Sequence, residues 1–124
     1  MPHCIDTDES YRIAFVALSG DIGLSDISAL FKDIRERFSG QDYSALIDVS
    51  AADLHGDIHA VRTVANFDRV FTRIAVYAPS AVSYGIARAY EALSQLYRER
   101  RVAVFRERER ALQWLMSAAA KTSL

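Results

Sequence analysis

The stretch that decides the fold is TRIAVYAP at residues 72–79, which precedes a long apolar helical pattern over residues 80–98. The arrangement is repeated at once, because VAVF at residues 102–105 precedes a second helical pattern over residues 107–119. Short apolar runs that lead into helical periodicity are typical of parallel strands covered by helices. The sequence therefore predicts an α/β fold assembled from strand-then-helix units.

The first half of the chain predicts two further strands of the same sheet. Residues 11–18 are β-rich and end at a Ser-Gly-Asp turn cluster, residues 19–21. Residues 3–5 are expected to pair with this strand as a hairpin across residues 6–9. Residues 43–49 form the second main strand, and an irregular loop over residues 50–56 follows. We expect one domain over residues 1–124, with a mixed, mostly parallel sheet of four to five strands and about four helices.

The first helix has clear boundary signals. Ser25 is expected as its N-cap, Asp26 lies in the first turn, and Gly40 follows its far end. A second helix is expected to begin near Asp57. The side chains of the first helix that recur at helical spacing, and are therefore expected to face inward, are Ile27, Leu30, Phe31, Ile34 and Phe38.

The third helix, residues 80–98 with Ser80 as its N-cap, is apolar around most of its circumference. Soluble domains bury such surface internally more often than not, so contact with another helix of the same chain is the favoured explanation. A dimer contact or a ligand crevice is the alternative. The stripe expected to face inward consists of Val82, Ile86, Ala89, Tyr90, Leu93 and Tyr97.

Composition and charge exclude several classes of protein. The 124 residues are 51% hydrophobic and 25% charged, and 15 basic residues nearly balance 16 acidic ones. This balance gives no reason to expect nucleic acid as a partner. Cys4 is the only cysteine, which favours a reducing, cytoplasmic location without a disulfide. No apolar run approaches the ~20 residues of a membrane span, and the polar first ten residues do not resemble a signal peptide.

The order of elements over residues 11–115 resembles the SpoIIAA-like, or STAS-like, family of small bacterial proteins. The most specific parts of this resemblance are RIAV at residues 73–76, Phe105, and ALQWL at residues 111–115. The resemblance implies a mixed sheet of four or five strands with helices. It implies little chemistry, because related folds include regulatory binding modules as well as CRAL-TRIO-like lipid carriers.

One function of the similar proteins requires a particular residue type at a single position. Anti-sigma-factor antagonists of this fold carry an Asp-Ser-Ser-Gly motif, whose serine is phosphorylated, after the second main strand. An ungapped match from residues 46–49 places GDIH, residues 56–59, at that motif, so no hydroxyl is present. Asp57 stands at the phosphoserine-equivalent position. It is interpreted first as a helix cap, and alternatively as a constitutive negative charge that imitates a phosphate.

No motif predicts catalysis or metal binding. Asp53, His55, Asp57 and His59 alternate along one loop, but a helix that starts at Asp57 leaves His55 in the loop, and no cysteine or glutamate is near enough to complete a site. We expect no metal and no cofactor. The glycines never cluster into a phosphate-binding loop, and Cys4 has no neighbouring base besides His3. The chain is therefore expected not to be an enzyme.

The arginine-rich segment at residues 98–110 contains six arginines and three glutamates. Interspersed glutamates favour a solvated, internally paired surface over a nucleic-acid site. Arg88, on the third helix, is expected to pair with Glu91 one turn further on.

The leading functional hypothesis is a non-catalytic binding module that recognises a protein partner or itself. Its contact surface is expected on the third helix, with Ala89 and Ala92 as interface candidates, and on the loops 20–24, 50–57 and 78–84 at the carboxyl ends of the strands. The alternative is a carrier of a small hydrophobic or lipid-like ligand. The residues expected to hold that ligand are Phe67, Phe71, Tyr84 and Tyr90, with Arg88 at the mouth.

Overall fold

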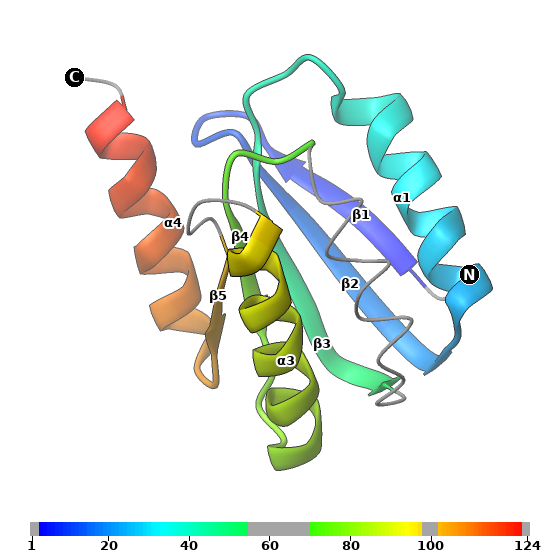
Figure 1. Ribbon diagram of the computed structural model, residues 1–124. Helices are drawn as coiled ribbons and strands as arrows, with labels where there is room; N and C mark the ends of the chain where they lie inside the picture. Colours follow the sequence, from blue (N-terminus) through cyan, green and yellow to red (C-terminus); the bar gives the residue numbers. More distant parts are fainter. Residues whose placement is uncertain (1–2, 55–69, 98–101, 123–124) are drawn as a thin grey trace.

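The computed structural model describes residues 3–54, 70–97 and 102–122, and within them five strands form a single sheet in the order β1-β2-β3-β4-β5. β1 is antiparallel to β2, and all other neighbours are parallel (Figure 1). The predicted α/β class with a mostly parallel sheet is confirmed. The described residues hold three helices, and the helix expected near Asp57 lies outside them. The elements are β1 His3–Asp8, β2 Ile13–Ile22, α1 Leu24–Phe38, β3 Ser44–Leu54, β4 Ile74–Tyr77, α3 Ala81–Tyr97, β5 Val102–Phe105 and α4 Arg108–Thr122.

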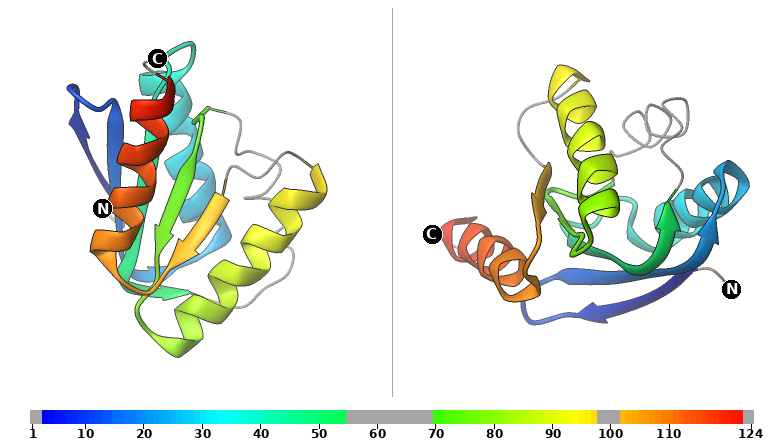
Figure 2. Two further views of the ribbon diagram at one scale, coloured as in Figure 1. Left: turned by 90° about the vertical axis from the view of Figure 1, so that its left-hand side faces the viewer. Right: turned by 90° about the horizontal axis from the view of Figure 1, so that it is seen from below.

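Helices cover both faces of the sheet and create two hydrophobic cores (Figure 2). α1 and α3 pack on one face, where alternate strand residues such as Val16, Ile47 and Val76 point. α4 packs on the other face, against Ile13 and Leu46 among others. We call these the first and the second core. The alternation of side chains along each strand assigns every second residue to the same core.

The N-cap of α1 lies two residues before the predicted one. It is Gly23, not Ser25, so this part of the prediction is wrong. The side chain of Asp26 accepts a hydrogen bond from the Gly23 N–H, with 2.9 Å between Gly23 N and Asp26 Oδ2. This bond satisfies an otherwise unpaired backbone donor and fixes the helix start at Leu24. The expected apolar side chains of α1 do face the first core.

The capping bond provides a test of this boundary. Asp26→Ala is expected to lower the free energy of unfolding by about 1 kcal/mol, because it removes the acceptor for Gly23 and a carboxylate near the helix N-terminus. Urea denaturation followed by circular dichroism measures the change. Ser25→Ala is the matched control, because Ser25 is exposed and lies inside the helix. Its stability should stay within about 0.5 kcal/mol of the parent. A larger loss in Ser25→Ala than in Asp26→Ala would contradict this helix start.

β2 and β3 extend well beyond their predicted ends. The predicted turn at residues 19–21 lies inside β2, and residues 50–54 of the predicted loop belong to β3, so both predictions are wrong. The cause is a β-bulge: Ala17 is paired with Asp48 but Ser19 is paired with Ala51, so β3 has one extra residue at this point. Gly20 has a positive φ of 76° there. A Ser-Gly-Asp sequence inside a strand next to a bulge has the same composition as a turn.

The amino-terminal hairpin is confirmed and is longer than expected. β1 pairs with β2 from His3, opposite Leu18, to Asp8, opposite Ile13. The turn is therefore at residues 9–12 and not at residues 6–9. The carboxylate of Asp8 accepts hydrogen bonds from the backbone of Ser10 and of Tyr11, at 3.0 and 3.3 Å. Such a local bond from an aspartate is a common way to hold a turn.

Candidate functional site

The carboxyl ends of the parallel strands lie at one edge of the sheet, where α1, α3 and α4 begin (Figure 1). Loops at this edge are the usual location of binding sites in α/β sheets. β2 and β3 project past β4, because β4 ends at Tyr77, opposite Asp48. The candidate site is therefore this edge together with α3, which begins there.

The start of α3 is fixed by two serines and one arginine. The Ser83 N–H donates to Ser80 Oγ at 3.1 Å, which confirms Ser80 as the N-cap. Arg106, just after β5, donates from Nη2 to the Pro79 carbonyl at 3.0 Å. Its guanidinium also lies 5.6 Å from the centre of the Tyr84 ring. Arg106 thus joins the end of β5 to the start of α3, whereas the sequence indicated only a solvated charge. The arginine-aromatic pairing depends on strand order, which local sequence does not reveal.

α3 turns most of the described part of its predicted stripe toward the sheet, since Tyr90 is buried and Ile86 and Ala89 are partly buried against the first core. Its buried side chains include Ser83, Ala87 and Tyr90. Val82, which was expected to face inward, is 71% exposed, so that part of the prediction is wrong. A helix that is apolar around most of its circumference does not fix its own orientation. The exposed positions on its outer face are Ala81, Val82, Gly85, Arg88 and Ala92.

Arg88 and Glu91 form the ion pair that their spacing predicted. Arg88 Nη1 lies 2.6 Å from Glu91 Oε1. The arginine side chain is 56% exposed while the glutamate side chain is 12% exposed. The pair lets Glu91 sit at the border of the core, because a nearly buried carboxylate needs a partner. Arg88 is thereby held on the outer surface of α3.

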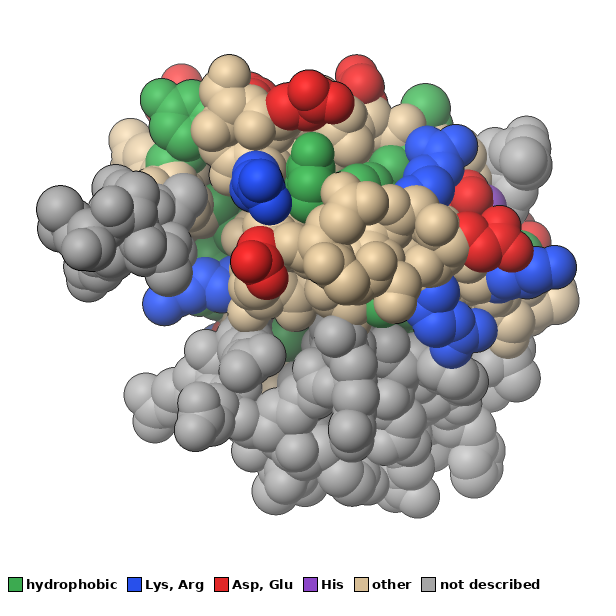
Figure 3. Space-filling view, turned by 90° about the horizontal axis from the view of Figure 1, so that it is seen from above, with side chains coloured by type: hydrophobic (Ala, Val, Ile, Leu, Met, Phe, Trp, Pro, Cys, Tyr) green, Lys and Arg blue, Asp and Glu red, His purple; other side chains and the backbone are tan. Residues whose placement is uncertain are grey.

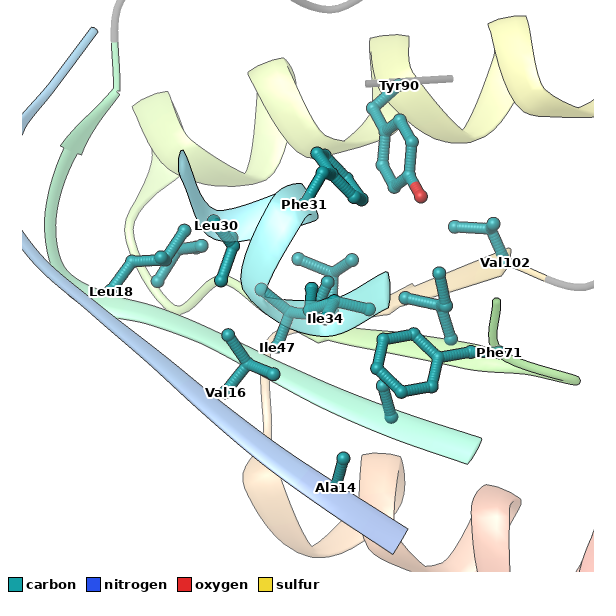
Figure 4. Close-up of a cluster of buried hydrophobic side chains, with 14 of the residues drawn as sticks. Ala14, Val16, Leu18, Leu30, Phe31, Ile34, Ile47, Phe71, Tyr90 and Val102 are labelled. Carbon is teal, nitrogen blue, oxygen red and sulfur yellow. The ribbon is translucent and has the colours of Figure 1, made fainter. Parts of the chain in front are cut away.

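The described aromatic ligand-binding candidates lie in or beside the first core. Phe71 and Tyr90 are buried in the first core (Figure 4), and the Phe71 ring lies 5.5 Å from that of Phe38. Tyr84 is partly buried beside this core and pairs with Arg106. Phe67 lies outside the described residues. The two buried rings therefore pack within the first core.

The other candidates are placed as follows. Ala89 is partly buried against the first core and Ala92 is exposed. Asp53 is exposed at the end of β3, while His55, Asp57 and His59 lie outside the described residues. Among the residues that the structure describes, no group of three or more histidine, cysteine, aspartate or glutamate side chains is placed to hold a metal ion.

The opposite edge of the sheet, where the parallel strands begin, has mixed charges. Figure 3 shows lysine and arginine side chains next to aspartate and glutamate side chains on this surface. The described side chains of this surface offer no continuous basic area for a phosphate backbone. Within the described part of the chain, no helix has the length and hydropathy needed to cross a membrane.

Solved structures with the same fold include two bacterial proteins. One is a protein of the DUF3478 family with a SpoIIAA-like fold from Shewanella loihica PV-4, with a TM-score of 0.59, 16% sequence identity, and 91% of each chain covered. The other is an anti-sigma factor antagonist from Mycobacterium paratuberculosis, with a TM-score of 0.58, 17% identity, and 91% of this chain and 92% of that chain covered. No family model and no curated protein matches the sequence. The chain therefore has the SpoIIAA-like fold that its sequence resembles.

Proposed function

We propose that the chain is a non-catalytic interaction module that binds a protein partner, or a second copy of itself, through the outer face of α3 and the adjoining carboxyl edge of the sheet. The observation that carries the proposal is Val82, an aliphatic side chain 71% exposed in the first turn of α3. Exposed Ala81 and Ala92 and exposed Gly85 continue the same outer face. Small side chains let the backbone of a partner approach closely, and exposed apolar surface commonly marks an interaction site.

The fold supports the same proposal. The similar structure from Mycobacterium paratuberculosis is named for antagonism of an anti-sigma factor, which is an action on another protein. In this chain GDIH at residues 56–59 offers no hydroxyl at the position that matches the phosphorylated serine. Binding is therefore proposed to be independent of phosphorylation at this position. A cytoplasmic location suits a partner of that class.

Ala92→Glu is expected to weaken association by at least about tenfold, because an interface would have to bury an unpaired carboxylate. Ala92 is exposed, so the variant should fold normally. Quantitative mass spectrometry of proteins captured by the tagged chain measures partner binding, and analytical ultracentrifugation measures self-association. Gln113→Glu is the matched control, since Gln113 is exposed on α4. Unchanged capture and unchanged sedimentation of Ala92→Glu would contradict the proposed surface. Ala89 is a poorer position for this test because it is partly buried.

The alternative, a carrier of a hydrophobic or lipid-like ligand, has less support from the described residues. Phe71 and Tyr90 already pack in the first core, and Arg88 is paired with Glu91. Native mass spectrometry of protein purified from cells distinguishes the two functions. A bound lipid mass would favour the carrier, whereas ligand-free protein would favour the interaction module.

A further inference from the structure

None of the described helices covers part of the second sheet face. α4 packs against β3, β4 and β5 on that side. The right-hand view of Figure 2 shows no described helix below β1 and the adjoining part of β2. The side chains of Cys4, Asp6 and Ala17 are exposed there.

The strand register shows which side chains share the uncovered area. Cys4 is paired with Ala17, and Ala17 with Asp48, so these three residues form one row across three strands. Neighbouring strands lie about 4.8 Å apart, and alternate residues on a strand about 6.6 Å apart. The next row holds Asp6 beside Phe15. Beyond the bulge Ala52 packs toward the first core, which places its neighbour Asp53 on the uncovered side.

We call this surface the open sheet face. Carboxylates dominate its polar groups, although the whole chain has a net charge of only −1. Asp6 Oδ1 accepts the Thr7 N–H at 2.9 Å, and Asp48 Oδ1 accepts the Ser50 N–H at 2.8 Å. A carboxylate oriented by one such bond still has capacity to accept hydrogen bonds from a ligand. The face is defined by Cys4, Asp6, Phe15, Ala17, Asp48 and Asp53.

An arginine of the chain itself marks the border of the open sheet face. The guanidinium of Arg108, at the start of α4, lies 5.8 Å from the centre of the Phe15 ring. Phe15 is only partly buried, and Asp6 is its neighbour on β1. A guanidinium can therefore contact this aromatic ring while the carboxylate of Asp6 lies on the neighbouring strand, directly opposite Phe15. The same pattern of groups suits a cationic side chain from outside.

Charge decides between the possible occupants. A negative surface repels nucleic acid and anionic membranes. In a two-fold dimer that paired this surface with itself, Asp6 and Asp48 would meet the same carboxylates of the second copy, which is unfavourable. Arginine and lysine side chains are complementary, and arginine adds bidentate bonds to carboxylates.

We propose that the open sheet face binds an arginine-rich segment of a protein partner, whose guanidinium groups pair with Asp6 and Asp48 and lie over Phe15. This surface is on the opposite side of the sheet from α3. It is therefore separate from the proposed α3 contact and does not depend on it. The two surfaces together would let the module bind two protein segments at once.

Fluorescence anisotropy with a labelled twelve-residue peptide of alternating arginine and serine tests this proposal. The double variant Asp6→Asn, Asp48→Asn is expected to bind the peptide at least about tenfold more weakly than the parent at 150 mM salt. Glu36→Gln, Asp42→Asn is the matched control, because both side chains are exposed and the change in net charge is the same. The control should stay within about twofold of the parent.

Several outcomes overturn the proposal. Equal weakening in both double variants would mean that the peptide responds only to net charge, and absent binding to the parent would exclude the site. A dimer that dissociates in Asp6→Asn, Asp48→Asn during ultracentrifugation would identify a second copy as the occupant. Ala92→Glu changes the α3 surface alone, so we expect it to bind the peptide as the parent does. Its result therefore separates failure of this proposal from failure of the α3 proposal.

Discussion

Leu115→Ala is expected to lower the free energy of unfolding by about 3 kcal/mol. Leu115 is 0% exposed and points from α4 into the second core, where the strand residues Leu46 and Ala75 also lie. Removing a buried leucine costs its transfer free energy plus the cavity that remains. Only α4 covers this face among the described residues, so no other described helix is placed to fill the cavity. Urea denaturation followed by far-ultraviolet circular dichroism measures the loss.

The position of the single tryptophan makes this prediction sharper. Trp114 lies next to Leu115, its ring is 5.8 Å from that of Phe105, and the Arg73 guanidinium lies 4.9 Å from its ring centre. Tryptophan fluorescence therefore reports the docking of α4 alone, while circular dichroism reports the whole fold. In Leu115→Ala we expect the fluorescence transition to precede the circular dichroism transition, because a helix with few buried contacts opens locally first.

Gln113→Ala is the matched control for this test, since Gln113 is exposed on the same helix. Its stability should stay within about 0.5 kcal/mol of the parent, and its two transitions should coincide. A loss below about 1 kcal/mol in Leu115→Ala would contradict the packing of α4 on the second face, since even well-relaxed leucine truncations cost more.

The sequence predicts β4 and β5 because each carries apolar side chains toward helices. Residues 74–77 and 102–105 are continuously apolar, and they form β4 and β5; β5 has the expected bounds, while β4 is shorter than the stretch 72–79. Burial on both faces removes the need for polar residues within such strands, so the apolar run itself defines the element. The ends of β2 and β3 do not follow this rule. Their last residues lie past β4, where one face is exposed, and a bulge breaks the alternation that a strand normally shows.

The candidate site was predictable in its location but not in its details. The position of α3 after β4 follows from the strand-then-helix order, and Ser80 is a clear cap. The orientation of α3 does not follow, because its apolar residues surround the helix and Val82 and Ala87 are equally plausible inward residues from composition alone. Arg106 was missed since its contacts to Pro79 and Tyr84 join segments that are distant in sequence. Tertiary packing decides both features.

The open sheet face illustrates the same limit. Asp6 and Asp48 are 42 positions apart, and only the register of β1, β2 and β3 brings them onto one surface. Each aspartate alone has an ordinary local explanation, because each accepts a nearby backbone N–H. A surface made of such residues becomes visible only when strand order is known.

Ile34→Ala is expected to lower the free energy of unfolding by about 4 kcal/mol. Ile34 is 1% exposed and points from the middle of α1 into the first core (Figure 4). Its neighbours in that core include Val16, Ile47 and Phe71, which come from three separate segments of the chain. A cavity lined by rigid strand residues collapses little, so the cost should lie in the upper part of the range for large-to-small changes. Urea denaturation of the parent and the variant measures it.

The two probes should respond differently to this change than to Leu115→Ala. β2 and β3 contribute to both cores, since Val16 and Ile47 face α1 while Ile13 and Leu46 face α4. Unfolding of the first core therefore also disrupts β2 and β3, against which α4 packs. The fluorescence and circular dichroism transitions of Ile34→Ala should therefore coincide. Lys32→Ala, at an exposed position of α1, should leave both transitions near those of the parent. Separate transitions in Ile34→Ala would mean that the two faces of the sheet unfold independently.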